Sequence, residues 1–228
     1  MIKIEHVETA GWEAALRGMR NPMNSWPKND SEFGTDFRPD GTHEYCEMGP
    51  NDKNLAMRLR NAGVEHRKYM RMVPIWCDIT APLYWWKQYD TYKVGTVANS
   101  CSTMHKLHAK EFTAEDFSCE DIINDVDDIL VYVGYAGEDF SPKAVFELML
   151  DALNMCRDKF LKTEDPRYWY SMVKMLPDSY NQKRTVMLNY EVLAKMYKER
   201  RHHKLAEWQD FCDWMKTLPA SELIVGEE

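Results

Sequence analysis

The chain has 228 residues, of which 44% are hydrophobic, and a formal net charge of −8 at pH 7. A chain of this length can bury a sizeable core within one domain, and its hydrophobic content excludes a wholly disordered protein. The acidic balance argues against a nucleic-acid-binding protein, which would need an extensive positive surface.

The six cysteines are irregularly spaced and form no C-x-x-C pair. The sequence also shows neither a secretory signal peptide nor an apolar run of about 18 residues. We therefore expect reduced thiols in a cytoplasmic protein, without a zinc site and without a membrane segment.

The first quarter of the chain predicts three regular elements and one long gap. Apolar residues within 2–7 predict a strand, and residues 12–19 predict a short helix. Residues 21–50 are rich in Asn, Pro, Gly, Asp and Thr and have no period, so we expect a long loop of functional importance. Residues 55–62 predict a helix that ends at Gly63.

A strand and a helix are expected next. Residues 69–79 alternate apolar and polar side chains, as a strand does. Asp78 or Thr80 would then be the N-cap of a helix with Pro82 in its first turn, running to about Asp90.

The rest of the chain is predicted to be mainly helical. Residues 94–98 suit a short buried strand, and a Ser-Pro pair starts a helix over 141–160. Residues 185–217 predict two helical pieces with apolar stripes. The whole pattern predicts an α+β fold in which residues 1–228 form one domain.

One acidic group invites a calcium site. Asp125, Asp127 and Asp128 lie close together, but the glycine and the terminal glutamate of an EF-hand loop are missing. We therefore expect no metal there.

A basic segment covers residues 198–204, with the sequence KERRHHK. Neighbouring cations repel one another, and a bound anion would offset that repulsion. The segment therefore predicts either a site for a phosphate or an anionic ring, or a solvated junction between two helices.

A second polar group could hold a phosphorylated ligand between a helix and a loop. Lys87 and Gln88 lie on the predicted helix, and Ser100, Cys101 and Ser102 follow the predicted strand. Cys101 could be a nucleophile, but an inert buried thiol is the favoured interpretation. Ser102 lacks a G-x-S-x-G elbow and suits a hydroxyl that donates to a ligand oxygen. The sequence contains neither a G-x-G-x-x-G nor a G-x-x-x-x-G-K-[ST] motif, so we expect neither a Rossmann-type dinucleotide site nor a P-loop.

Nine short segments occur in an order and spacing that carry a family resemblance. They are Glu65-His66, Pro82, Lys87-Gln88, Thr91-Tyr92-Lys93, Asn99 to His105, Leu176-Pro177, Asn189-Tyr190-Glu191, Glu199-Arg200 and Glu207-Trp208-Gln209. Together they resemble the motifs of flavin-dependent thymidylate synthases over about two-thirds of the chain. The resemblance implies a single-domain fold with a mixed sheet flanked by helices, and a homotetramer with active sites between subunits.

The resemblance also implies a site. Arg200 would be catalytic, because a cation beside the pyrimidine ring stabilises negative charge on it and makes C5 nucleophilic. The expected substrate-binding residues are Lys87, Gln88, Ser100, Cys101, Ser102 and Lys174. The expected cofactor-binding residues are His66, Tyr92, Lys93, Val94, Asn189 and Lys195.

The implied function is an FAD-dependent transfer of a one-carbon unit to C5 of a dUMP-like pyrimidine nucleotide. NADPH and methylenetetrahydrofolate would be the co-substrates. The alternative is a non-catalytic relative that binds a nucleotide or another protein on the same scaffold.

Six positions depart from the family motifs. The family has Arg, His, Glu, Arg, Arg and Arg where this chain has Thr91, Tyr92, Ser100, Met104, Val173 and Glu191. The loss of an arginine from a phosphate site removes bidentate, charge-assisted bonds. Other cations would have to rebuild the phosphate site, or else the ligand differs; the candidates are Lys87, Lys93, Lys174 and Arg201.

Overall fold

The computed structural model describes residues 2–39, 41–124 and 141–226. The three aspartates of the calcium hypothesis lie outside this range. Strands are β1 (Lys3–Thr9), β2 (Glu32–Arg38), β3 (Gly41–Glu47), β4 (Pro74–Pro82), β5 (Val97–Ser100) and β6 (Asn181–Asn189). Helices are α1 (Trp12–Arg20), α2 (Pro50–Asn61), α3 (Leu83–Tyr89), α4 (Pro142–Thr163), α5 (Pro166–Met175), α6 (Tyr190–Arg200), α7 (Ala206–Lys216) and α8 (Glu222–Val225).

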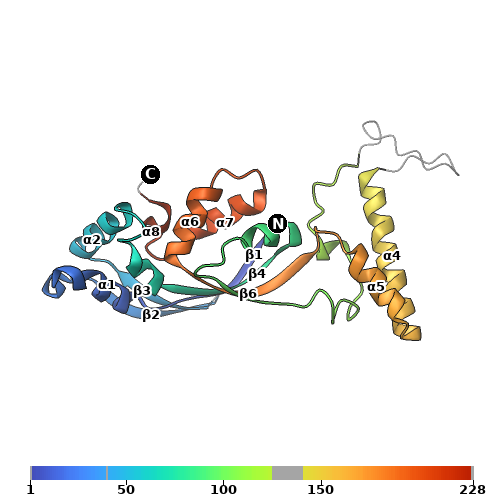
Figure 1. The fold of residues 1–228 in the computed structure, drawn as a ribbon, viewed down its shortest axis with the longest axis horizontal. Coiled ribbons are helices and arrows are strands. Elements are labelled where there is room, and N and C mark those ends of the chain that lie inside the picture. The colour runs from blue at the N-terminus through green and yellow to red at the C-terminus, as the bar shows by residue number, and fades with distance from the viewer. Residues whose placement is uncertain (1, 40, 125–140, 227–228) are drawn as a thin grey trace. The chain divides into compact units, whose positions relative to one another are not determined.

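The strands form one mixed sheet in the order β2-β3-β1-β4-β6-β5 (Figure 1). β1 pairs in parallel with β3 and antiparallel with β4, while β2–β3 and β5–β6 are antiparallel pairs. The predicted α+β class with a mixed sheet flanked by helices is confirmed. Within the described residues, no helix is both long and apolar enough to cross a membrane.

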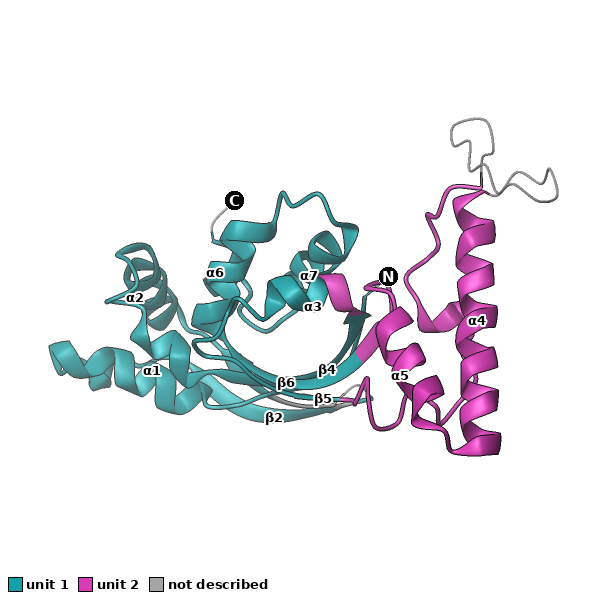
Figure 2. Cartoon of the chain, turned by 45° about the vertical axis from the view of Figure 1, so that its right-hand side comes forward, with its two compact units in different colours: residues 1–81, 85–100, 183–228 teal, residues 82–84, 101–182 magenta. Residues whose placement is uncertain are grey.

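The chain divides into two compact units (Figure 2). Unit 1 comprises residues 1–81, 85–100 and 183–228, and unit 2 comprises 82–84 and 101–182. Unit 1 holds nearly all of the sheet, with α6, α7 and most of α3 over its concave face (Figure 2). Unit 2 is built on α4 and α5, which pack around Leu153 and Met172. That residues 1–228 form one domain stays a prediction, since a compact unit need not fold alone.

Aromatic side chains fill the space beneath α3 and α7. Trp85, Trp208 and Phe211 have no exposed surface, and the Trp85 ring lies 4.8 Å from Trp208 and 5.4 Å from Phe211 between centroids. Aromatic pairs at such distances contribute about 0.5–1.5 kcal/mol each beyond the area they bury. Trp85 and Trp208 therefore serve to pack α3 against α7.

A fully buried ion pair joins α1 to α2. The Arg20 side chain is 3% exposed and that of Asp52 is 0% exposed, with Nη2 2.6 Å from Oδ1. The other carboxylate oxygen of Asp52 accepts from Ser31 Oγ at 2.6 Å and from the Asp30 amide at 3.1 Å. These bonds fix the chain between the two helices.

The prediction of a long loop over residues 21–50 is wrong. Two short 3₁₀ turns are followed by the β2–β3 hairpin, whose register runs from Glu32↔Glu47 to Arg38↔Gly41. The hairpin was missed because β2 is the outermost strand, and its Phe37 is 81% exposed, so the apolar alternation is weak. The Pro-Asp-Gly sequence at 39–41 is typical of a turn between two strands, and it could have predicted the hairpin.

The predicted helix start at Asp78 or Thr80 is also wrong, since β4 runs on to Pro82 and α3 begins at Leu83. Asp78 uses its carboxylate across the sheet, where it accepts from Thr185 Oγ1 at 2.6 Å and pairs with Lys183 at 2.9 Å. Because an aspartate is suited both to capping a helix and to pairing across strands, its presence in the sequence does not distinguish the two roles. The segment before β4, Lys68–Met72, is a 3₁₀ turn rather than part of the strand.

Two further elements differ from expectation. β5 is exposed at all four residues rather than buried. Residues 181–189 form β6, so the first of the two predicted C-terminal helices begins only at Tyr190. The other predicted helices are present, and the Ser141 hydroxyl accepts from the Ala144 amide as the expected N-cap of α4.

We expect Asp52→Asn to destabilise the fold by about 3–5 kcal/mol, because it leaves the buried Arg20 charge uncompensated. Urea unfolding followed by circular dichroism measures this loss. Lys53→Ala, which removes an exposed ion pair with Glu222, should cost no more than about 1 kcal/mol. Equal losses in the two variants would contradict the importance of the buried pair.

Candidate functional site

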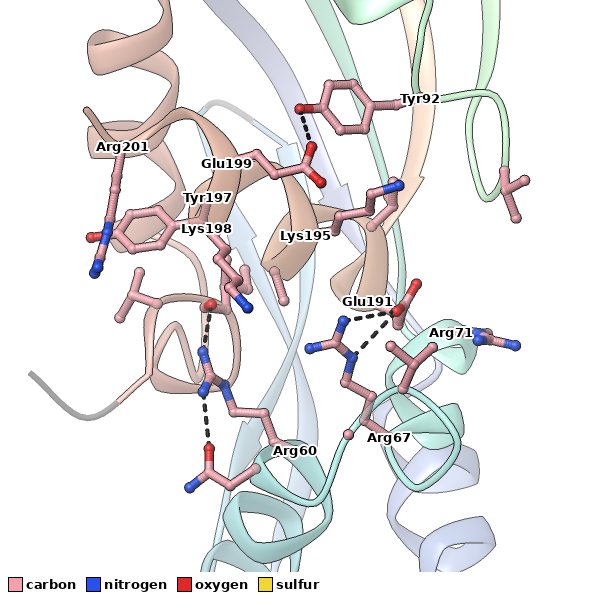
Figure 3. A pocket seen from close by; sticks show the side chains of 18 of the residues that line it. Arg60, Arg67, Arg71, Tyr92, Glu191, Lys195, Tyr197, Lys198, Glu199 and Arg201 are labelled. Carbon is pink, nitrogen blue, oxygen red and sulfur yellow. Dashed lines mark hydrogen bonds and ion pairs between the residues drawn. The ribbon is translucent and has the colours of Figure 1, made fainter. Parts of the chain in front are cut away.

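A cavity of about 890 Å³ opens in unit 1 between the C-terminal end of α2, the segment 63–71, the turn 91–94, one side of α6 and the C-terminal residues 224–225 (Figure 3). Its lining is rich in cations. The cationic residues are Arg60, Arg67, Arg71, Lys93, Lys195, Lys198 and Arg201, against the two acids Glu191 and Glu199. We call this space the cationic cavity.

Some of these cations already have partners. Arg67 donates from Nε and Nη2 to one oxygen of Glu191, at 3.3 and 3.1 Å. Arg60 donates to the carbonyls of Leu223 and Ile224 and so holds α8. The other five cationic side chains of the lining form no ion pair among the described residues. They are those of Arg71, Lys93, Lys195, Lys198 and Arg201. The cavity thus concentrates uncompensated positive charge within an acidic chain and is suited to an anion.

Beside the cavity, the side-chain oxygen of Gln88 joins three helices. It accepts from Arg200 Nη1 at 3.0 Å and from Trp208 Nε1 at 2.9 Å. The Arg200 guanidinium also lies over the Trp208 ring, 4.7 Å from its centroid. Because α3, α6 and α7 each supply one member, the position of Arg200 depends on the packing of all three.

Tyr92 connects this group to the cationic cavity, which it lines. Its hydroxyl donates to Glu199 at 2.8 Å and accepts from Arg200 Nε at 2.9 Å. Burial, followed by the hydrogen bond to Glu199, raises the pKa of Tyr92 to about 12. Tyr92 therefore keeps its proton at neutral pH and acts as donor and acceptor at once.

Most of the predicted cofactor residues lie together. Tyr92, Lys93, Val94 and Lys195 line the cationic cavity. His66 is exposed and outside the lining, while its neighbour Arg67 is within it.

Asn189 has a structural role. Its side-chain oxygen accepts from the Val192 amide as the N-cap of α6, and its amide group reaches the Gly95 carbonyl at 3.5 Å. It supports the turn that carries Val94.

The predicted substrate residues are divided. Gln88 and Arg200 contact each other in unit 1, where Lys87 and Ser100 are exposed and outside the cavity lining. Cys101, Ser102 and Lys174 belong to unit 2, whereas Arg200 belongs to unit 1.

Within unit 2, the predicted residues have local partners. Ser102 Oγ accepts from the amides of Met104 and His105 at 3.1 and 2.8 Å. Cys101 is exposed, so the expectation of a buried thiol is wrong. Lys174 lies over the Tyr170 ring, 5.9 Å from its centroid.

Three arginines of the cavity were missed by the sequence interpretation, namely Arg60, Arg67 and Arg71. They lie in residues 58–71, a stretch that holds five Lys and Arg residues and in which His66 is the one predicted site residue. That local charge was the available signal. Lys198 and Arg201 come from the basic segment 198–204, so this segment contributes to an anion-suited cavity as well as forming a helix junction.

The fold is similar to those of two solved structures. Thymidylate synthase X of Helicobacter pylori, solved with FAD and dUMP, has a TM-score of 0.64 at 17% identity, covering 100% of this chain and 98% of that one. The UMP/dUMP methylase PolB of Streptomyces cacaoi, solved with 5-Br dUMP, has a TM-score of 0.56 at 15% identity, covering 95% and 89%. This likeness confirms the predicted thymidylate-synthase-like fold. No protein-family model matches the chain, and a comparison with curated proteins found no match.

His203 follows Arg200 in the turn before α7 and makes the region sensitive to pH. Its Nδ1 accepts from the Leu205 amide at 3.1 Å, which requires an unprotonated nitrogen. Burial, and then the charge of Arg200, lowers the pKa of His203 below its ordinary value of 6.5. A lowered pKa means that the unfolded chain binds the proton more tightly, so this contribution to stability is present above pH 6.5 and is lost as the pH falls through the folded value.

We expect His203→Asn to reduce this loss, because an asparagine oxygen can accept from the amide two residues on without titrating. Unfolding free energies at pH 7.5 and pH 5 should differ less in His203→Asn than in the unmodified chain. His202→Asn, at the exposed neighbour, is the control and should leave the difference unchanged. Identical pH dependence in all three proteins would contradict the role of Nδ1.

Proposed function

We propose that this chain is a flavin-dependent enzyme that transfers a one-carbon unit to C5 of a pyrimidine nucleotide resembling dUMP. One observation carries the proposal: Arg200 and Gln88, which the sequence resemblance assigns to the nucleotide, are hydrogen-bonded to each other beside a cationic cavity. The similarity of the fold to a structure solved with FAD and dUMP supports the same function.

The cationic cavity suits the pyrophosphate of FAD in charge and has the volume of an ordinary ligand pocket. A pyrophosphate needs several cations, and the side chains of Arg71, Lys93, Lys198 and Arg201 face the cavity without ion-pair partners among the described residues. Its volume of about 890 Å³ is within the usual range for ligand pockets, about 300–1,000 Å³. Bound flavin, reduced by NADPH, would supply a hydride.

The chemistry of the chain itself centres on Arg200. Its guanidinium would face the pyrimidine oxygens and stabilise the negative charge that develops on the ring, so that C5 attacks the one-carbon unit of methylenetetrahydrofolate. Gln88 holds one side of that guanidinium. Fixed donors of this kind require little reorganisation during the reaction, which is why their placement matters more than their number.

The nucleotide phosphate would be bound by residues that replace the missing family arginines. Lys87 and Lys174 remain predicted phosphate contacts, with Ser100, Cys101 and Ser102 as predicted partners of the nucleotide. A homotetramer with sites between subunits would bring residues of different subunits together. The tetramer and a cytoplasmic location remain predictions.

The alternative is a non-catalytic nucleotide-binding relative. It is favoured by Met104, a residue without charge where the family has a phosphate-binding Arg. Glu191, the other charge departure, is neutralised by Arg67 and does not by itself exclude an anionic ligand. The two functions differ in one measurable property, the exchange of hydrogen at C5 of the nucleotide.

We expect the purified protein to bind FAD, and the double variant Arg71→Ala, Lys198→Ala to weaken that binding at least about tenfold, since each lost charge-assisted contact is worth about 1.5–3 kcal/mol. Titration by quenching of flavin fluorescence measures this. Arg17→Ala with Lys28→Ala removes the same charge from exposed positions outside the cavity and should leave affinity within about twofold. No FAD binding by the unmodified chain would refute the flavin assignment.

We expect Arg200→Ala to abolish tritium release from C5 of labelled dUMP, assayed with FAD, NADPH and methylenetetrahydrofolate, while flavin binding is largely kept. Arg200→Lys keeps the charge without the planar fork and should retain a small part of the activity. Lys216→Ala, on the exposed side of α7, is the control. Release that survives in Arg200→Ala would show that Arg200 is not the catalytic cation.

A further inference from the structure

We propose that Tyr92 and Glu199 are positioning residues that set the orientation of the Arg200 guanidinium. This inference rests on the function proposed above. It assigns a role to Tyr92, which stands where the family has a histidine. The three side chains form one directed chain of hydrogen bonds within unit 1, from Arg200 through Tyr92 to Glu199.

The direction of that chain is determined by chemistry. An arginine can only donate, and an ionised carboxylate can only accept. The Tyr92 oxygen therefore accepts from Arg200 Nε at 2.9 Å, and its single proton goes to Glu199 Oε2 at 2.8 Å. A phenol fills both positions at once, which a phenylalanine cannot do at all.

These contacts leave one edge of the guanidinium available. Nε donates to Tyr92, Nη1 donates to Gln88 at 3.0 Å, and the flat face lies over Trp208. Nη2 has no hydrogen-bond partner among the described residues. Since three partners restrain the group from different elements, the free Nη2 edge has a defined direction and can donate to ligand oxygens.

Tyr92 also connects this guanidinium to the cavity. Its ring lies 5.5 Å from Arg200 and 5.8 Å from Lys195, measured from the cationic group to the ring centroid. The tyrosine side chain is buried, and its ring forms part of the cavity lining. One residue therefore positions the predicted catalytic cation and forms a wall for the predicted cofactor.

The orientation can be measured without any ligand or activity. In nitrogen-15 NMR spectra, a hydrogen-bonded arginine Nε–H exchanges slowly with water, and the Arg200 signal is identified by its loss in Arg200→Lys. We expect Tyr92→Phe to speed this exchange at least tenfold. Glu199→Gln, which still offers an oxygen to the Tyr92 proton, should stay within threefold of the unmodified chain, and Glu199→Ala should be faster than both.

Tyr197→Phe is the matched control, because it removes a hydroxyl from another buried tyrosine of the same cavity. It should leave the Arg200 exchange rate unchanged. Unchanged exchange in Tyr92→Phe, or an equal acceleration in Tyr197→Phe, would overturn the proposed positioning.

A second measurement separates this inference from the function it rests on. If C5 tritium release is present, Tyr92→Phe should lower kcat at least tenfold more than it raises KM, and a loss in KM alone would contradict the inference. If the unmodified chain releases no tritium but Tyr92→Phe still frees the Arg200 Nε–H, the positioning is supported and the proposed reaction is refuted.

Discussion

The side-chain oxygen of Gln88 is the point on which the candidate site depends. Through its two bonds, to Arg200 and to Trp208, it connects α3, α6 and α7 above the sheet. Since the surrounding core is aromatic, a polar group there is costly unless it is fully bonded. The bonds that satisfy the amide oxygen also restrain the Arg200 guanidinium. The packing of the core therefore determines where this cation lies.

Charge is arranged locally in a protein that is acidic as a whole. The cationic cavity collects side chains that lie far apart in the sequence, including Arg67 and Lys198, in a chain whose net charge is −8. Repulsion among these groups is relieved only in part by Glu191 and Glu199. Glu191, where the resemblance expects an arginine, forms an ion pair with Arg67.

Local sequence patterns predicted those elements whose signals are local. The Ser141 cap, the amphipathic helices and the end of α2 follow from side chains a few residues apart. The β2–β3 hairpin and the first residue of α3 did not follow, because a weakly buried outer strand lacks clear alternation and because Asp78 bonds to Thr185 far along the chain. Asn189, which the resemblance assigns to a cofactor, caps α6 through a bond to the Val192 amide.

The sequence by itself determined the fold class and the family it resembles, and it predicted Gln88, Tyr92 and Arg200 as site residues, because residue types in a fixed order carry that information. Tertiary structure alone decided that these three residues touch and that Glu199 completes their chain of hydrogen bonds. It also decided that arginines from the segment 58–71 face the same cavity as α6. Each of these contacts joins residues about a hundred positions apart, and no local pattern encodes such a distance.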